Sequence, residues 1–295
     1  MTKNESKVLD YLEGMTEIIE NMPAKDYHAS EGVSASQIKH GDDTMLEMRH
    51  YITTPYPANK AMSWGSKGHI WVLQYDQRWD MCALYKGPTE GKGSQTELKA
   101  FTAANPDKEI LKPDEVVKLD AMRESVYGKS YIARMIESAA SEVSLFWKGN
   151  YGKAKCRFDL MGSDFFVDAK IVPKASINEK SFAWHIKKAP HKGHLQLGHY
   201  RTGFMSQFAH KPKCGFLAIA KDAPYDCALY WMDDTWVDEG AERAHEIACL
   251  YKACELSNRF DGVQTDGAEV LYNPDKKWDD DEVDVSKGTM EVEEL

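Results

Sequence analysis

The sequence has no apolar run that approaches the roughly 20 residues a helix needs to cross a bilayer. The first fifteen residues, MTKNESKVLDYLEGM, are polar and mixed in charge, and they contain no apolar core like that of a secretory signal. With 42% hydrophobic and 28% charged residues, the composition is that of an ordinary soluble globular protein. These features predict a cytoplasmic protein without a membrane partner.

Cysteine is scarce and scattered, and no two cysteines stand in a CxxC pair. Zinc knuckles, disulfide frameworks and four-cysteine iron–sulfur clusters all need closer and more regular spacing. We therefore expect reduced thiols in or near the core. The positions are Cys82, Cys156, Cys214, Cys227, Cys249 and Cys254.

Positive charge is in deficit, since the net charge is −10. This total excludes a protein that is basic over its whole surface, but a nucleic-acid partner depends more on how the charge is distributed. Residues 275–295 hold nine acids and three lysines, a net −6, whereas residues 148–192 hold ten Lys or Arg and four acids, a net +6. One concentrated basic segment can hold a polyanion, so DNA is not excluded.

The spacing of apolar residues predicts helices, a run of strands, and further helices and strands. Helices are expected over 5–21, 36–41, 60–75, 113–138, 177–188, 193–208 and 234–257. The polar, Gly-rich stretch 86–96 predicts a mobile loop. Strands are expected over 142–147, 154–161, 164–172, 214–220 and 227–232. This order predicts an α/β (α+β) fold with a central sheet flanked by helices.

The domain organisation follows from the same reading. We expect an N-terminal helical segment over residues 1–32 and one domain over 33–260. Residues 261–295 have few apolar side chains and many acids, so they predict an acidic tail without fixed structure.

The segment CRFDLMGSDFFVDAKIV carries the chemistry. Asp168 and Lys170 stand at i and i+2 of one predicted strand and therefore project from the same face. If the preceding strand is an antiparallel neighbour, Asp159 lies across from them. Two converging carboxylates repel unless a cation sits between them, and hard oxygen ligands favour Mg²⁺ or Mn²⁺. A lysine beside a metal-bound water can orient it and stabilise charge on phosphorus.

This trio has a simpler interpretation. D-x-K occurs often by chance, and surface Asp/Lys pairs usually contribute little. The apolar strand around Asp168 and Lys170 argues that the charges are buried and need partners, yet a core ion pair would also satisfy them. The segment alone leaves both readings open.

Four ordered blocks extend the argument: VSASQIKHGDDTMLEMRHYITTP, WGSKGHIWVLQ, EVSLFWKGNYGKAKCRFDLMGSDFFVDAKIVPKAS and HLQLGHYRTGF. Together, over roughly residues 33–205, they resemble the PD-(D/E)XK nuclease superfamily, and specifically the RecE-like phage exonucleases of the exonuclease VIII type. The resemblance implies a restriction-endonuclease-like core with a mixed sheet.

The resemblance also implies roles for single positions. Asp159 and Asp168 match metal ligands, with the backbone carbonyl of Ala169 as a further ligand, and Lys170 matches the catalytic lysine. His69 matches a helix histidine that approaches the metal, although a lone helix histidine is more often structural.

Gln196 and Tyr200, one turn apart on one helix face, match a pair that lies beside the active site. Without the resemblance they would be ordinary helix-surface residues. Glu142 matches an acid that is frequent before the hairpin and has a supporting role only. Gln74 departs from the pattern, because relatives often have a glutamate there, so the number of metal ions is open.

The basic segment supplies candidate DNA contacts. Phosphate contacts position DNA without reading its sequence, and a solvated helix face is the alternative for the same residues. The candidates are Arg157, Lys174, Lys180, Lys187, Lys188 and Lys192. Trp64, Trp71 and Trp184 could stack on an unpaired end base, but core packing is the commoner role of tryptophan.

The resemblance implies a Mg²⁺-dependent 5′→3′ exonuclease acting on the ends of linear double-stranded DNA. The product would be a 3′ single strand for a phage-type annealing protein, and the enzyme a homo-oligomeric ring in the cytoplasm of a bacterial host. Alternatives are a RecB-like or CRISPR-adaptation nuclease, a sequence-specific endonuclease, and a non-catalytic DNA-binding protein that keeps the fold. The intact Asp159, Asp168 and Lys170 argue against the last of these.

Overall fold

A mixed six-stranded sheet forms the centre of the protein. The computed structural model describes residues 16–54, 60–88, 93–188, 191–208 and 210–263. The strand order is β1-β4-β5-β6-β7-β8, with β6 and β7 parallel and all other neighbours antiparallel. The strands are β1 (Glu17–Glu20), β4 (Ala140–Gly149), β5 (Gly152–Met161), β6 (Phe165–Val172), β7 (Lys213–Ala220) and β8 (Cys227–Trp231). The predicted mixed sheet is confirmed.

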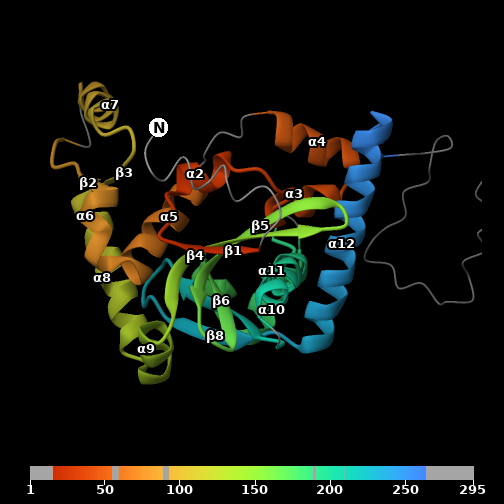
Figure 1. Cartoon of the computed structure of the whole chain (residues 1–295). Coiled ribbons are helices and arrows are strands. Elements are labelled where there is room, and N and C mark those ends of the chain that lie inside the picture. The colour runs from red at the N-terminus through yellow and green to blue at the C-terminus, as the bar shows by residue number, and fades with distance from the viewer. Residues whose placement is uncertain (1–15, 55–59, 89–92, 189–190, 209, 264–295) are drawn as a thin grey trace, which may run out of the picture.

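Helices cover both faces of this sheet (Figure 1). One face packs on α5 (Lys60–Leu73), α8 (Pro113–Tyr127) and α9 (Ser130–Glu137). The other face packs on α10 (Glu179–Lys187), α11 (Gly193–Gln207) and α12 (Asp234–Ser257). The crossover through α10 and α11 is what allows β6 and β7 to run parallel. The predicted sheet flanked by helices is thus confirmed.

Smaller elements surround this core. The helices α3 (Ala35–Gly41) and α4 (Met45–Thr53) pack with α11 and α12 around Ile38, Met48 and Leu195. A separate two-stranded parallel sheet joins β2 (Cys82–Leu84) to β3 (Glu109–Leu111). The remaining elements are α2 (Ala24–Ala29), η2 (Tyr75–Gln77), α6 (Arg78–Met81), α7 (Ser94–Ala104) and η3 (Lys174–Ser176).

The prediction of a helix over residues 5–21 is wrong where the structure describes this segment. Glu17–Glu20 form β1, which pairs antiparallel with Val143–Phe146 at the edge of the sheet. Ile18 and Ile19 fit either helical or extended spacing. The edge of β4 offers unpaired backbone N–H and C=O groups, and pairing with them favours the strand. Residues 1–15 and the acidic stretch from 264 onward lie outside the described residues, and the proposed domain limits stay a prediction.

Two other predictions need correction. The helix expected over 113–138 is two helices, because Gly128 caps the end of α8 and the chain turns there before α9. This break lets Ile132 and Met135 reach the core. The loop expected over 86–96 ends early, since Ser94 begins α7 after Gly93 at φ +100°. The part of that loop at 89–92 lies outside the described residues.

The core cysteines agree with the expectation of reduced thiols. Cys82, Cys156, Cys214 and Cys227 are free and buried. Among the residues that the structure describes, no helix is both long and apolar enough to cross a bilayer.

Candidate active site

The β5–β6 hairpin brings two carboxylates together, as the sequence predicts. The paired register covers only the two residue pairs next to the turn. Beyond them, Oδ2 of Asp159 accepts the backbone N–H of Ala169 at 2.7 Å. The Asp159 side chain therefore lies between the two strands.

Asp168 and Lys170 point to the same side of β6, which confirms the i, i+2 argument. Lys170 Nζ lies 2.5 Å from Oδ2 of Asp168 as an ion pair. Its approach is outside hydrogen-bond geometry, so the buried Oδ2 accepts no hydrogen bond. The Asp168 side chain is only 5% exposed. The Lys170 ammonium thus compensates the charge of this buried carboxylate.

His69 reaches the hairpin from α5, on the opposite side of β6. Its Nε2 lies 2.8 Å from the carbonyl oxygen of Ala169, and its Nδ1 lies 3.6 Å from Oδ2 of Asp159. The histidine therefore lies where the resemblance expects it. The carbonyl of Ala169, expected to bind metal, is within hydrogen-bond distance of this imidazole, and its role as a ligand stays a prediction.

Glu142 is closer to the site than its supporting role in the sequence analysis suggests. It lies on β4 with φ +53°, a left-handed backbone conformation that non-glycine residues rarely adopt. Its ligand oxygen, those of Asp159 and a ring nitrogen of His69 all lie within 4.8 Å of one another. Arg157 Nε lies 2.5 Å from Oε2 of Glu142. The sequence signal for Glu142 was its place before the hairpin.

The protons of this cluster are shifted by its surroundings. Burial raises the pKa of Asp159 to about 7, and the charges of Asp168 and Glu142 add to this while His69 opposes it. Burial alone would lower the pKa of His69, but the carboxylates of Asp159, Glu142 and Asp168 outweigh it and the pKa is raised. The cluster therefore retains protons that a bound cation would displace.

These residues fit a hard divalent cation. Carboxylates from Glu142 on β4 and Asp159 on β5 and the imidazole of His69 on α5 offer ligand atoms within 4.8 Å of one another, and the charge of Asp168 on β6 acts on the same site. Carboxylate oxygens are the ligands that Mg²⁺ and Mn²⁺ prefer. The raised pKa of Asp159 indicates that the negative charge of this carboxylate is poorly compensated in the buried site.

Gln196 and Tyr200 both lie on α11 but differ in their surroundings. Gln196 is buried, and its Nε2 donates to Oδ1 of Asp168. The Tyr200 ring lies 5.4 Å from that of Phe158 and 6.1 Å from that of Phe166. Burial, with the charges of Asp168 and Asp159 among smaller causes, raises the pKa of Tyr200. Gln196 touches the predicted metal ligands, whereas Tyr200 forms part of the aromatic wall behind them.

Lys39 is a site residue that the sequence analysis missed. It lies on α3, and its Nζ donates to Oε1 of Gln196 at 2.6 Å. Lys170 Nζ donates to the same oxygen at 3.3 Å. Burial, together with the charge of Lys170, lowers the pKa of Lys39 to about 7. No local pattern marks Lys39, because its partner is 157 residues away in the chain.

The predicted DNA-contact residues fall into two groups. Lys174, Lys187 and Lys188 are exposed on η3 and at the end of α10. Lys192 is buried, and its ammonium reaches Asp42 at 3.1 Å, Asp43 at 2.6 Å and the carbonyl of Lys39 at 2.9 Å.

Arg157 is engaged with Glu142, although its buried Nη1 has no hydrogen-bond partner. Contacts with DNA stay a prediction for all six residues, of which four are exposed: Lys174, Lys180, Lys187 and Lys188.

The three tryptophans also separate. Trp71 is 1% exposed and donates to Asp120, so it is a core residue. Trp64 packs against the same core cluster as Trp71. Trp184 is 55% exposed, with the ammonium groups of Lys187 and Lys188 within 5.8 Å and 5.2 Å of its ring centre.

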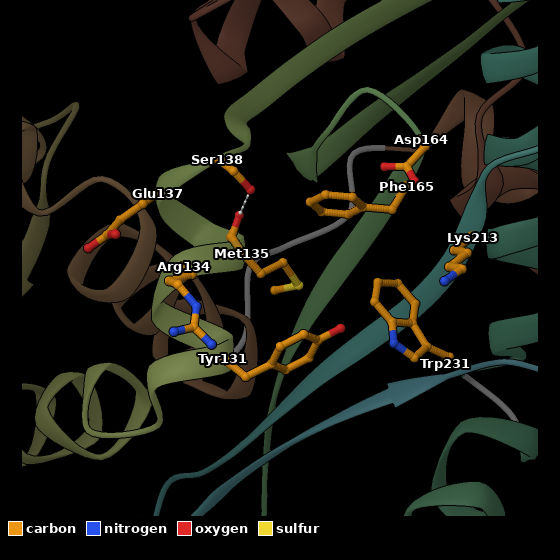
Figure 2. A pocket seen from close by; sticks show the side chains of 9 residues that line it. All are labelled: Tyr131, Arg134, Met135, Glu137, Ser138, Asp164, Phe165, Lys213 and Trp231. Atoms are coloured by element: carbon orange, nitrogen blue, oxygen red, sulfur yellow. Dashed lines mark hydrogen bonds between the residues drawn. The ribbon is translucent and has the colours of Figure 1, made fainter.

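A hollow of about 640 Å³ lies elsewhere, between α9 and the ends of β6, β7 and β8. Figure 2 shows Tyr131 and Arg134 on one side of it and Lys213 and Trp231 on the other. Its lining contains none of the site residues above. Two cations and two acids line it, so it has no net preference for a polyanion.

Residues 34–270 match the model of a family described as a PDDEXK-like domain of unknown function (DUF3799). This stretch covers most of the chain and includes every residue of the site. No curated protein matches the chain.

Solved structures also match. A candidate exonuclease from Eubacterium rectale gives a TM-score of 0.56 at 13% sequence identity, over 86% of this chain and 94% of that one. LHK-Exo in complex with dAMP gives a TM-score of 0.33 at 15% identity, over 77% of this chain and 90% of that one. The first match establishes a similar fold. With the family match, it confirms the predicted restriction-endonuclease-like core.

Proposed function

Because the chain belongs to the family of PDDEXK-like domains of unknown function (DUF3799), we propose that it is a metal-dependent nuclease that hydrolyses DNA. One observation carries the proposal: Glu142, Asp159 and His69 offer ligand atoms within 4.8 Å of one another, beside the ion pair of Asp168 and Lys170. The fold shared with a candidate exonuclease supports the same class of reaction.

The residues have separable roles in this proposal. Asp159 and Asp168 hold the cation, with Glu142 and His69 beside them. Bound there, Mg²⁺, or Mn²⁺ in its place, supplies a water of lowered pKa and positive charge for the phosphate. Lys170 orients that water and stabilises the negative charge that develops on the phosphate oxygens.

Exonuclease action on linear double-stranded DNA is the more specific proposal. The 5′→3′ polarity, the 3′ single-stranded product and an annealing protein as partner follow from the resemblance of the four sequence blocks to RecE-like exonucleases. The exposed Lys174, Lys187 and Lys188 support it, since they offer phosphate contacts from the segment that carries a net +6.

Digestion of linear duplexes labelled at the 5′ or the 3′ end tests the proposal. We expect Mg²⁺-dependent release of the 5′ label as mononucleotides, and complete loss of activity with a chelator. Lys170→Ala should lower kcat by about 100-fold or more, because it removes charge stabilisation from the transition state. The matched control is Lys129→Met, which should keep full activity. Lys129 pairs with Asp226 and is not one of the site residues.

Each result separates the alternatives. Activity that survives both the chelator and Lys170→Ala would show that the assigned site is wrong. Cleavage of closed circular DNA would favour an endonuclease, because an exonuclease needs an end. Binding of DNA without any hydrolysis would favour the non-catalytic alternative.

A further inference from the structure

Gln196 is held by two ammonium groups and in turn holds Asp168. Its Oε1 accepts from Lys39 Nζ at 2.6 Å and from Lys170 Nζ at 3.3 Å, while its Nε2 donates to Oδ1 of Asp168. A carbonyl oxygen accepts two hydrogen bonds, so both acceptor positions are used. A flipped amide would place its NH₂ group against two cations and its oxygen against a carboxylate. The two lysines therefore decide which end of the amide faces Asp168.

Lys170 cannot perform this task alone during a reaction. Its ammonium lies 2.5 Å from Oδ2 of Asp168, the oxygen that a cation would take. In the proposed function Lys170 must also face the attacking water and the phosphate. Lys39 is the nearer donor to Gln196, at 2.6 Å against 3.3 Å for Lys170. It can keep the amide in place while Lys170 acts elsewhere.

The position of Lys39 is itself fixed by the fold. Lys192 donates to the carbonyl oxygen of Lys39 at 2.9 Å and pairs with Asp42 and Asp43 just beyond α3. This contact joins the C-terminal end of α3 to the N-terminal end of α11, which carries Gln196. The buried Lys192 thus connects the two helices through these contacts.

We propose that Lys39 is a positioning residue that acts through Gln196 to keep Asp168 presenting Oδ2 to the cation. The inference rests on the proposed function for its effect on turnover. Lys39 need not touch the substrate. Its loss should leave DNA affinity nearly unchanged and lower the rate of the chemical step.

A double-mutant cycle between Lys39→Met and Gln196→Met tests this inference. Each single change should lower kcat about tenfold, since each removes a hydrogen bond to a charged group, and KM should stay within about twofold. The double variant should be no slower than the slower single variant, because the two residues act in series. Lys39→Arg, which keeps a donor, should recover part of the rate. Lys129→Met is the control for loss of a lysine.

Several outcomes would overturn the inference. Additive losses in the double variant would mean that Lys39 acts independently of Gln196, for example by touching the phosphate. A rise in KM with unchanged kcat would mean the same. A Lys39→Met variant with wild-type kcat and KM would exclude any role in turnover.

The cycle can be read without nuclease activity. Calorimetric titration gives the Mn²⁺ affinity of the wild-type chain, the two single variants and the double variant. The effect of Lys39→Met on this affinity should differ between the wild-type chain and the Gln196→Met chain. Equal changes in both backgrounds would overturn the inference. If the wild-type chain binds Mn²⁺ with this coupling but does not degrade DNA, the proposed function fails and the positioning role stands.

Discussion

Asp159 differs from a surface carboxylate in when it loses its proton. Its pKa of about 7 results first from burial and then from the neighbouring charges of Asp168 and Glu142. The folded chain therefore binds more protons than the unfolded chain between the ordinary carboxylate pKa of about 4 and this raised value. His69 shifts in the same direction. The contribution of these groups to stability is complete at low pH and is lost as pH rises through about 7.

The first prediction concerns metal and pH together. A divalent cation competes with these protons, so Mg²⁺ should raise the melting temperature more at about pH 8 than at about pH 6. Thermal unfolding followed by circular dichroism at both pH values, with Mg²⁺ and with chelator, measures the difference. Asp159→Asn should reduce it strongly. An equal rise at both pH values would contradict the assignment of Asp159 as a ligand.

At the scale of elements, the contact between α11 and α12 depends on two glycines. A Cβ at Gly198 would meet the backbone of Gly240 and Ala241, and a Cβ at Gly240 would meet the backbone of His194. Backbone cannot give way as a flexible side chain can. The helix that carries Gln196 is thus placed by a close backbone approach to α12.

The second prediction follows from this approach. Gly198→Ala should lower the free energy of unfolding by about 1–3 kcal/mol, because the added methyl group overpacks the helix crossing. Gly65→Ala is the matched control, since a Cβ there meets nothing within 4 Å. Alanine in α5 should leave stability unchanged or raise it by up to about 1 kcal/mol. Urea unfolding of both variants decides, and equal stabilities would contradict the close approach.

The end of α10 combines an exposed aromatic ring with two lysines. Trp184 is 55% exposed beside Lys187 and Lys188. The ring centre of the next residue, His185, lies 4.1 Å from that of His191. Burial and then the charge of Lys170 lower the pKa of His185. An aromatic face flanked by cations suits an unpaired nucleotide.

The third prediction concerns this surface. Trp184→Ala should weaken binding of DNA with a frayed end by roughly 5- to 100-fold, which corresponds to the loss of one base–aromatic stack. Tyr131→Ala is the matched control, because Tyr131 is 56% exposed but lies at the hollow on α9. Fluorescence anisotropy in chelator gives both affinities. Equal affinities for the two variants would exclude Trp184 as a stacking platform.

At the scale of the whole molecule, the distribution of charge along the chain limits how the protein can bind DNA. The chain is acidic overall, at −10, yet residues 148–192 carry a net +6. A ring that turns this segment inward and the acids outward would hold a duplex in spite of the net charge. The ring is a proposal that rests on the resemblance to RecE-like exonucleases.

The fourth prediction is therefore an oligomer. Size-exclusion chromatography with light scattering should give a mass that is a multiple of 33.4 kDa at working concentrations. The affinity of the oligomer for DNA should fall steeply as the salt concentration rises, because counterions compete with the protein for the phosphates. A single species of 33.4 kDa at every concentration would exclude the ring and leave the proposed chemistry untouched.

The sequence determined the parts of this protein that depend on local periodicity. The common side of Asp168 and Lys170 and the hairpin that carries Asp159 follow from side-chain alternation, and the structure agrees with both. The helices expected over 60–75, 193–208 and 234–257 follow from apolar spacing and are also present, whereas those expected over 5–21 and 113–138 needed correction. Family membership followed from the order of the sequence blocks, because each block keeps its own local pattern.

Tertiary structure decided what depends on contacts between distant segments. Lys39 reaches Gln196 across 157 residues, and Glu142 joins His69 and Asp159 only because β4, β5 and α5 meet. Pairing with β4 turned an expected helix at Glu17–Glu20 into a strand. Among the predicted DNA contacts, Lys192 is buried in ion pairs whereas Lys187 and Lys188 are exposed, and no sequence pattern predicts this difference. The physical reason is the same throughout: these positions are set by long-range packing and charge, and neither leaves a period in the chain.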